Sequence, residues 1–200
     1  MTDIKRICVY CGSGDGRNPM YRHSADRLGA LLADAGIGLV YGGGSLGLMG
    51  TIAKSVLKNG GQVTGIIPKF LTEREKMLRD VQELIVTDDM HERKRLMFEH
   101  SDAFVALPGG VGTLEETVEM LTWSQLGRHN KPILLVNING FWDPLCALFE
   151  HMLDQAFIRE GLSVRYLVAD TVEEVVPKLR AAIARLPEGA ETASETVEKM

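Results

Sequence analysis

Short apolar runs and longer amphipathic stretches alternate along almost the whole chain. Apolar runs of this length are typical of buried strands, and the stretches between them place apolar residues at helical spacing. The expected strands cover residues 4–10, 37–41, 62–67, 84–86, 103–107, 132–136 and 166–168. The expected helices cover residues 19–35, 51–58, 90–100, 114–125, 143–156 and 171–184. The pattern therefore predicts strands that alternate with helices from one end of the chain to the other.

Residues that cap helices mark several of these boundaries. Asn18-Pro19 reads as an N-cap followed by proline at the first helical position. Asp89 and Glu92 have the spacing of a capping box, in which two side chains accept hydrogen bonds from backbone N–H groups at a helix start. Thr171 and Glu174 repeat that spacing before the last predicted helix.

The regular alternation of strand and helix predicts an α/β fold. Strands joined through helices run parallel, and a parallel sheet is covered by helices on both faces. No repeat or linker divides the chain, so residues 1–186 are expected to form a single domain. Residues 72–80 are charged and fit either a loop or a short helix. Residues 187–200 are rich in Glu, Thr and Ala and are expected to be disordered.

Glycine-rich turns follow three of the predicted strands, at residues 11–16, 42–50 and 108–112. A parallel sheet brings the carboxyl ends of its strands to one edge, where ligands bind in such folds, so all three turns are expected there. Glycine lets backbone N–H groups converge on a ligand, and the helix after the last turn carries partial positive charge at its start. The edge is therefore expected to bind an anion, most often a phosphate. The candidate binding residues of the turns are Gly12, Ser13, Gly43, Gly44, Gly109, Gly110 and Gly112.

Charge and composition narrow the possible partners. The formal net charge is −5 and no block of Lys or Arg stands out, so nucleic acid and anionic membrane are poor expectations. No stretch approaches the roughly 18–20 apolar residues of a membrane span. The N-terminus has no signal-peptide pattern, and we expect a cytoplasmic protein.

Cys8 and Cys11 form a C-x-x-C motif. A redox pair of this spacing usually opens a helix, and a zinc site needs further ligands. Here Cys8 lies inside an apolar strand and Cys11 begins the turn after it. We therefore expect two buried, structural side chains and no metal site.

Other sites of α/β proteins fit the sequence less well. The loop 42–47 matches the spacing of the dinucleotide fingerprint, but the next strand ends in Ile66-Ile67-Pro68-Lys69, without the acidic residue that binds the ribose. The chain has no P-loop motif, and neither a P-loop nucleotide-binding protein nor a serine hydrolase is expected. A pyridoxal phosphate enzyme stays open on motif alone, although no lysine is singled out.

Two charged groups next to the glycine turns are candidates for chemistry. Arg93 and Lys94 lie on the helix before the strand 103–107, and a solvated basic helix start is the simpler interpretation. Glu116 follows the last glycine turn and has capping-box spacing with Thr113. Glu116 can therefore have either a structural role as a helix cap or a catalytic role.

Two motifs together resemble the signature of the Lonely Guy (LOG) family. They are Met90-x-x-Arg93-Lys94 and Pro108-Gly109-Gly110-x-Gly112-Thr113-x-x-Glu116. The similarity runs from Ile7 to about Ala156. Members of the family are cytokinin riboside 5′-monophosphate phosphoribohydrolases. Many carry an older lysine decarboxylase label that the sequence gives no reason to accept.

The resemblance implies a Rossmann-like, doubly wound fold with a mainly parallel sheet, usually a homodimer. It implies hydrolysis of the N-glycosidic bond of an N6-modified adenosine 5′-monophosphate, or of AMP, to free base and ribose 5-phosphate, without a metal or redox cofactor. By motif, Arg93 and Glu116 would be the catalytic pair. Contacts with the nucleotide would come from Glu75, Lys94, Gly110, Val111, Gly112, Thr113, Leu114, Glu115 and Thr122.

Two further expectations accompany the resemblance. Thr122 lies about 13 Å along the helix from Thr113, so it would contact another part of the ligand or act across a dimer interface. A nucleotide- or molybdenum-cofactor-binding carrier on the same fold is the alternative function. The presence of both Arg93 and Glu116 favours the enzyme.

Overall fold

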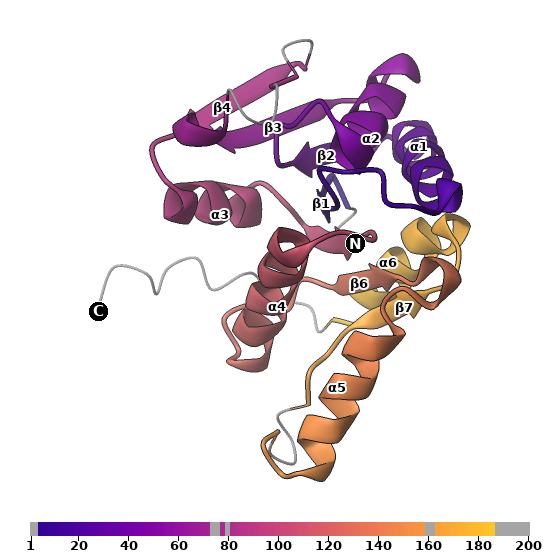
Figure 1. Cartoon of the computed structure of the whole chain (residues 1–200), viewed down its shortest axis with the longest axis vertical. Helices are drawn as coiled ribbons and strands as arrows, with labels where there is room; N and C mark the ends of the chain where they lie inside the picture. Colours follow the sequence, from indigo (N-terminus) through magenta and orange to yellow (C-terminus); the bar gives the residue numbers. More distant parts are fainter. Residues whose placement is uncertain (1–3, 73–76, 79–80, 159–162, 187–200) are drawn as a thin grey trace.

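The computed structural model describes residues 4–72, 77–78, 81–158 and 163–186. Within these residues, seven strands form one parallel sheet in the order β4-β3-β2-β1-β5-β6-β7 (Figure 1). The strands are β1 (Arg6–Tyr10), β2 (Gly38–Tyr41), β3 (Val63–Pro68), β4 (Glu83–Thr87), β5 (Ala103–Ala106), β6 (Ile133–Val136) and β7 (Leu167–Ala169). The predicted α/β fold and its parallel sheet are confirmed.

The helices alternate with the strands as the hydrophobic pattern predicts. They are α1 (Pro19–Asp34), α2 (Gly47–Lys58), α3 (Met90–Glu99), α4 (Val111–Gln125), α5 (Asp143–Asp154) and α6 (Val175–Ile183). Short 3-10 turns cover η1 (Lys69–Leu71), η2 (Ile138–Gly140) and η3 (Val172–Glu174). The remainder of the ambiguous stretch at 73–76 and 79–80, and the tail expected to be disordered, lie outside the described residues.

The predicted N-caps are formed. The Asn18 side chain accepts a hydrogen bond from the Met20 N–H at 2.9 Å, with Pro19 as the first helical residue. Asp89 accepts one from the Glu92 N–H at 2.9 Å at the start of α3, but the Glu92 side chain accepts from the Asp88 N–H at 2.9 Å, so the predicted box is displaced by one residue on that side. Thr171 and Glu174 make the capping box, which starts the turn η3 immediately before α6. Local sequence therefore fixes where these elements begin.

Helices cover both faces of the sheet (Figure 1). On one face, the side chains of α1, α2 and α6 pack on Ile7 and Val9 of β1 in one apolar cluster. On the other face, α3 and α4 pack on Cys8 and Tyr10 of the same strand. Successive residues of a strand point to opposite faces, so β1 contributes to both cores.

Strand β1 lies at the centre, between β2 and β5. It pairs with β2 through Ile7 and Leu39, and with β5 through Ile7 and Ala103. The chain reverses its direction of winding here, because β2 to β4 extend the sheet to one side and β5 to β7 to the other. In open α/β sheets this switch point is where the loops part and ligands bind.

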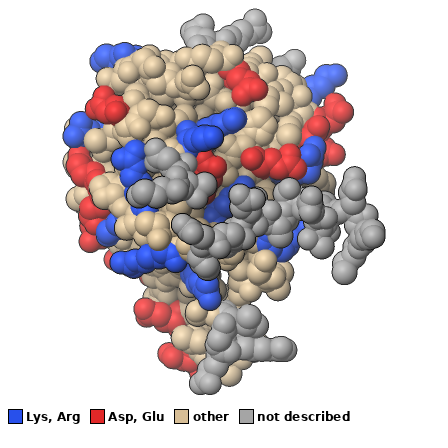
Figure 2. All heavy atoms as spheres, turned by 180° about the vertical axis from the view of Figure 1, so that it is seen from behind, with Lys and Arg blue, Asp and Glu red and all other residues tan. Residues whose placement is uncertain are grey.

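The remaining surface has two features of interest. Helix α5 projects beyond the sheet (Figure 1), and none of its side chains is fully buried. Acidic and basic side chains are interspersed over much of the face in Figure 2. Among the described helices, none combines the length and the apolar character that crossing a bilayer requires.

Candidate active site

The glycine-rich turn after β5 opens into α4 at the switch point. Gly110 is the N-cap of this 15-residue helix, and no side chain caps it. The Leu114 N–H donates to the Gly110 carbonyl at 3.0 Å, so the helix begins earlier than the sequence pattern predicts. A helix N-terminus therefore faces the edge at which the sequence predicts an anion.

Neither backbone strain nor packing explains why residues 110 and 112 are glycine. Neither Gly110 nor Gly112 has a positive φ. A Cβ at either position would meet no atom within 4 Å outside its immediate surroundings in the chain. Two glycines that face open space at a helix start allow a ligand to approach the backbone closely. An anion bound against this turn would supply a physical reason for both residues.

Arg93 lies on α3 and its guanidinium is held inside the protein. Its Nε donates to the Ile66 carbonyl of β3 at 3.2 Å, and its Nη1 lies 3.8 Å from the Met90 Sδ. Only 7% of the residue is exposed. The solvated-helix interpretation is therefore wrong for Arg93, because its side chain turns toward the sheet and away from solvent.

Glu116 faces Arg93 from the neighbouring helix. The Arg93 Nη2 and Glu116 Oε1 atoms lie 3.5 Å apart, with 8% and 12% of the side chains exposed. The predicted capping box of Thr113 and Glu116 is wrong, because α4 begins at Val111 and places Thr113 third in the helix. Glu116 consequently lies in the second turn, where its carboxylate pairs with a permanent cation.

Lys94 makes a second, more open bridge between the same helices. Its Nζ contacts Glu115 and lies 3.4 Å from Glu119. Partial burial alone would lower the pKa of Lys94, but the hydrogen bonds and charges of Glu115 and Glu119 together raise it above its ordinary value. Lys94 is therefore a protonated cation held between Glu115 and Glu119 of α4.

The three glycine turns meet as predicted. The Gly12 N–H donates to the Pro108 carbonyl at 3.1 Å, and the Gly12 carbonyl accepts from Leu48 at 3.0 Å. Gly12 therefore joins the turns after β1, β2 and β5, with the adjacent Ser13 exposed at their junction. Gly43 is tied to the segment 77–78, because its carbonyl accepts from the Leu78 N–H at 3.1 Å. Gly44 forms an isolated bridge with Met77.

The other predicted site residues differ in position. Thr113 is buried and its carbonyl accepts the Thr117 hydroxyl at 2.6 Å, whereas Val111 is 82% exposed and Leu114 37%. Thr122 is exposed farther along α4, and its hydroxyl donates to the Val118 carbonyl at 2.8 Å. The structure does not bring Thr122 to the glycine turn. Glu75 lies outside the described residues.

The charge of Glu116 acts on three buried groups of β1 and the turn after it, Cys8, Tyr10 and Cys11. Burial raises the pKa of the Cys8 and Cys11 thiols well above the ordinary range, and the charge of Glu116 adds to the effect. Burial likewise raises the pKa of Tyr10. Both cysteines are free and buried as predicted, and no metal-binding group of His, Cys, Asp or Glu occurs among the described residues. Glu116 and Arg93 therefore face each other among groups that stay neutral near pH 7.

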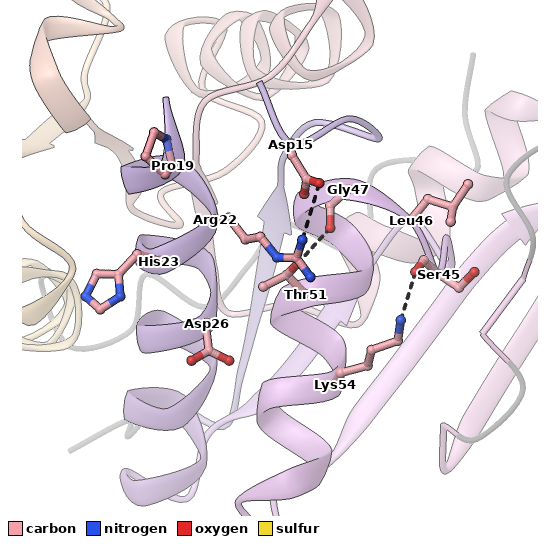
Figure 3. Close-up of a pocket in the computed structure, with 10 residues that line it drawn as sticks. All are labelled: Asp15, Pro19, Arg22, His23, Asp26, Ser45, Leu46, Gly47, Thr51 and Lys54. Carbon is pink, nitrogen blue, oxygen red and sulfur yellow. Dashed lines mark hydrogen bonds and ion pairs between the residues drawn. The ribbon is translucent and has the colours of Figure 1, made fainter. Parts of the chain in front are cut away.

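A cavity of about 600 Å³ lies outside this constellation. It opens between α1 and α2, where Lys54 donates to the Ser45 carbonyl and Arg22 pairs with Asp15 (Figure 3). It is lined in part by the glycine turns after β1 and β2, through Asp15 and residues 45–47, but by none of the individually named candidate residues. Its charged side chains are of both signs, and we assign no ligand to it.

Fold and site together define a Rossmann-like α/β protein with an open glycine turn at its switch point and a buried Arg–Glu pair on the helices α3 and α4. A family model described as "Possible lysine decarboxylase" matches residues 49–179. A probable cytokinin riboside 5′-monophosphate phosphoribohydrolase of Oryza sativa subsp. japonica is 49% identical over 174 residues, covering 87% of this chain and 78% of the relative. The LOG1 phosphoribohydrolase of Arabidopsis thaliana is 44% identical and covers 91% of this chain and 85% of its own length.

The chain belongs to the Lonely Guy (LOG) family. Among solved structures, the molybdenum cofactor binding protein of Rippkaea orientalis has a TM-score of 0.66 at 24% identity, covering 92% of this chain and 99% of its own. That likeness shows the fold alone.

Sequence reasoning missed two contributors to the site. Glu119 supports Lys94 from one turn beyond Glu115, a spacing that the helix periodicity could have revealed. Gly42 lies against the Arg93 guanidinium, and a Cβ there would overlap Nη2. No sequence signal distinguishes Gly42 from the glycines beside it, because its role depends on a side chain from a distant helix.

Proposed function

We propose that the protein hydrolyses the N-glycosidic bond of N6-modified adenosine 5′-monophosphates, of AMP, or of both. The bond between C1′ and the base nitrogen breaks, water supplies the oxygen on C1′, and the base leaves with a proton. The products are free base and ribose 5-phosphate. The observation that carries the proposal is the buried Arg93–Glu116 pair beside a glycine turn open to an anion.

The turn and the pair have separate tasks in this reaction. The backbone at Gly110 and Gly112, with the N-terminus of α4 behind it, binds the 5′-phosphate and fixes the ribose. Cleavage develops positive charge at C1′. The Glu116 carboxylate either stabilises this charge or takes a proton from the attacking water. Arg93 holds that carboxylate in place from α3.

The relatives support an enzyme over the alternative carrier. Proteins that share 44–49% identity over most of the chain are named phosphoribohydrolases, whereas the cofactor-binding neighbour is 24% identical. The charge of Lys94 also argues against a Schiff-base role for that residue. A lysine that forms a Schiff base must lose its proton, and the surroundings of Lys94 raise its pKa.

We further propose a cytoplasmic homodimer. Exposed apolar side chains at the C-terminal end of α4 and on and after α5 support a second copy as the partner, at Leu126, Leu148, Leu153 and Phe157. Such a contact would bring Thr122, which lies far from its own glycine turn, toward the ligand of the other subunit. Light scattering tests this, since a mass near the 22.0 kDa of one chain would contradict it.

The phosphate requirement tests the proposed reaction. AMP and N6-isopentenyl-AMP are incubated with the pure protein beside their unphosphorylated ribosides, and free base is measured. We expect the monophosphates to react at least about 10²-fold faster in kcat/KM, because binding energy from the phosphate orients the reacting bond. Equal turnover of the ribosides would contradict the role of the glycine turn.

A single methyl group sharpens the same test. Gly112→Ala adds a Cβ to open space on the second residue of α4, where alanine suits a helix at least as well as glycine. Stability should therefore hold, while KM for the monophosphate rises about tenfold, the scale of one charge-assisted hydrogen bond.

A further inference from the structure

We infer that Gly42, the residue after β2, is a positioning residue whose missing side chain makes the space in which Arg93 meets Glu116. The inference rests on the proposed function for the catalytic meaning of that pair. Its physical content concerns only how the guanidinium is placed.

The backbone of Gly42 does not itself require glycine. Its φ is not positive, in contrast to the neighbouring Gly43 with a φ of 78°. A Cβ on Gly42 would overlap the Arg93 Nη2 and lie 3.1 Å from the Met49 Sδ. The residue is buried, so no solvent-filled gap could take up the extra carbon. Glycine is needed here because of a neighbour and not because of the turn.

The guanidinium has little freedom to step aside. Its Nε is anchored on the Ile66 carbonyl at 3.2 Å. Its Nη2, the atom nearest the added carbon, is also the atom that faces Glu116 at 3.5 Å. The guanidinium is planar and rigid, so moving Nη2 rotates the whole fork. The Met49 thioether is flexible and can yield by the few tenths of an ångström that its contact needs.

A side chain at position 42 would therefore change the orientation of the Glu116 carboxylate, because it would displace the guanidinium that faces this carboxylate. At least one N–H on each guanidinium nitrogen already faces the protein, at Ile66, Met90 and Glu116. Arg93 consequently orients Glu116 more than it encloses a phosphate, which stays with the glycine turn across the site. Displacement of the guanidinium should lower the rate of the chemical step and leave nucleotide binding nearly unchanged.

Gly42→Ala tests the inference through the division between kcat and KM. We expect kcat to fall about 10²-fold, the scale of a reacting group misplaced by roughly 1 Å. KM should change less than about threefold, because the turn that binds the phosphate is untouched. A merely structural role would instead reduce the folded fraction and leave kcat per folded molecule as it was. A Gly42→Ala protein with wild-type kcat would overturn the inference.

A double-mutant cycle with Arg93→Ala separates this inference from the proposed function. In the Arg93→Ala background, the alanine at position 42 has no guanidinium to displace. The changes that Gly42→Ala causes in kcat and in melting temperature should therefore be less than about half of those it causes in the wild type. Equal effects in both backgrounds would refute it, and so would failure of both single and double variants to fold. If Met49→Ala restored the kcat of the Gly42→Ala protein, the added methyl group would act through Met49 of α2 and not through Arg93.

The melting temperatures in this cycle can be compared without any measurement of enzyme activity. If the wild-type protein cleaved no nucleotide, the proposed function would be refuted. The melting temperatures of the cycle would still show whether Gly42 positions the Arg93 guanidinium.

Discussion

Two bridges join α3 to α4, and adjacent residues make them in different surroundings. Arg93 and Glu116 form the inner bridge, with side chains 8% and 12% exposed. Lys94 and Glu115 form the outer one, where the Glu115 side chain is 51% exposed and Glu119 assists. The pairing of charges is the same, but only the inner bridge lies where water is largely excluded.

The difference indicates which pair performs chemistry. A carboxylate in a low-dielectric site acts strongly on charge that develops nearby, whereas an exposed one is screened by water. A cation with two carboxylate neighbours, as Lys94 has, keeps its proton but is compensated in charge, and it links α3 to α4. The inner bridge is therefore expected to govern kcat, and the outer bridge KM and stability.

Removal of the inner negative charge should have the largest effect. Glu116→Gln keeps a side chain that can accept a hydrogen bond from Arg93 but cannot stabilise positive charge at C1′ or take a proton. We expect hydrolysis of AMP to slow by about 10²–10⁴-fold, the range of a lost acid–base group. Nucleotide binding, measured by calorimetry, should persist.

Glu115→Gln is the matched control for this change. It makes the same chemical substitution one residue earlier, on a carboxylate that faces Lys94 near solvent. We expect its effect on kcat to be milder by at least tenfold. Comparable losses in the two variants would show that both carboxylates act on the reacting bond.

Removal of the inner positive charge should affect both rate and stability. Arg93→Ala removes the guanidinium that faces the buried Glu116 carboxylate, and should cost about 1–3 kcal/mol of unfolding free energy. Hydrolysis should fall by at least about 10²-fold, the scale of a lost charged contact in an active site. Denaturant unfolding and turnover measured on one preparation test the two effects together, and full activity would refute the inner bridge.

Removal of the outer cation should have the smallest effect. Lys94→Ala breaks contacts with Glu115 and Glu119 that are partly open to water, and such pairs contribute roughly 0.2–1 kcal/mol. We expect a rise in KM of a few fold, near-normal kcat, and recovery in Lys94→Arg. A loss of kcat as large as that of Arg93→Ala would show that the outer bridge also governs kcat.

The edge of the sheet that carries the site was predictable from the sequence. Glycine turns after β1, β2 and β5 needed only the rule that parallel strands end on one side, and the hydrogen bond from Gly12 to Pro108 joins two of them. The N-caps at Asn18 and Asp89 were equally local, because each depends on residues two or three positions away.

The burial of Arg93 was not predictable in this way. Helix α3 has a polar sequence, MHERKRLMFE, with no apolar stripe that reveals an inward face. Arg93 turns inward because Ile66 offers a carbonyl and Gly42 leaves space, and both lie on other elements. The capping-box prediction for Glu116 failed for a related reason. The turn at Gly110 lets α4 start at Val111, ahead of the residue that the pattern selected.

The central position of β1 has a consequence for how each molecule is made. One edge of β1 pairs with β2, which follows within forty residues, but the other waits for β5, where Tyr10 meets Ala106. A growing chain therefore carries an apolar strand with an open edge until residue 106 has left the ribosome. Unpaired edges of this kind invite pairing with other chains. The same closure brings the turn after β1 against the turn after β5, so the candidate site is assembled only when β5 pairs with that edge.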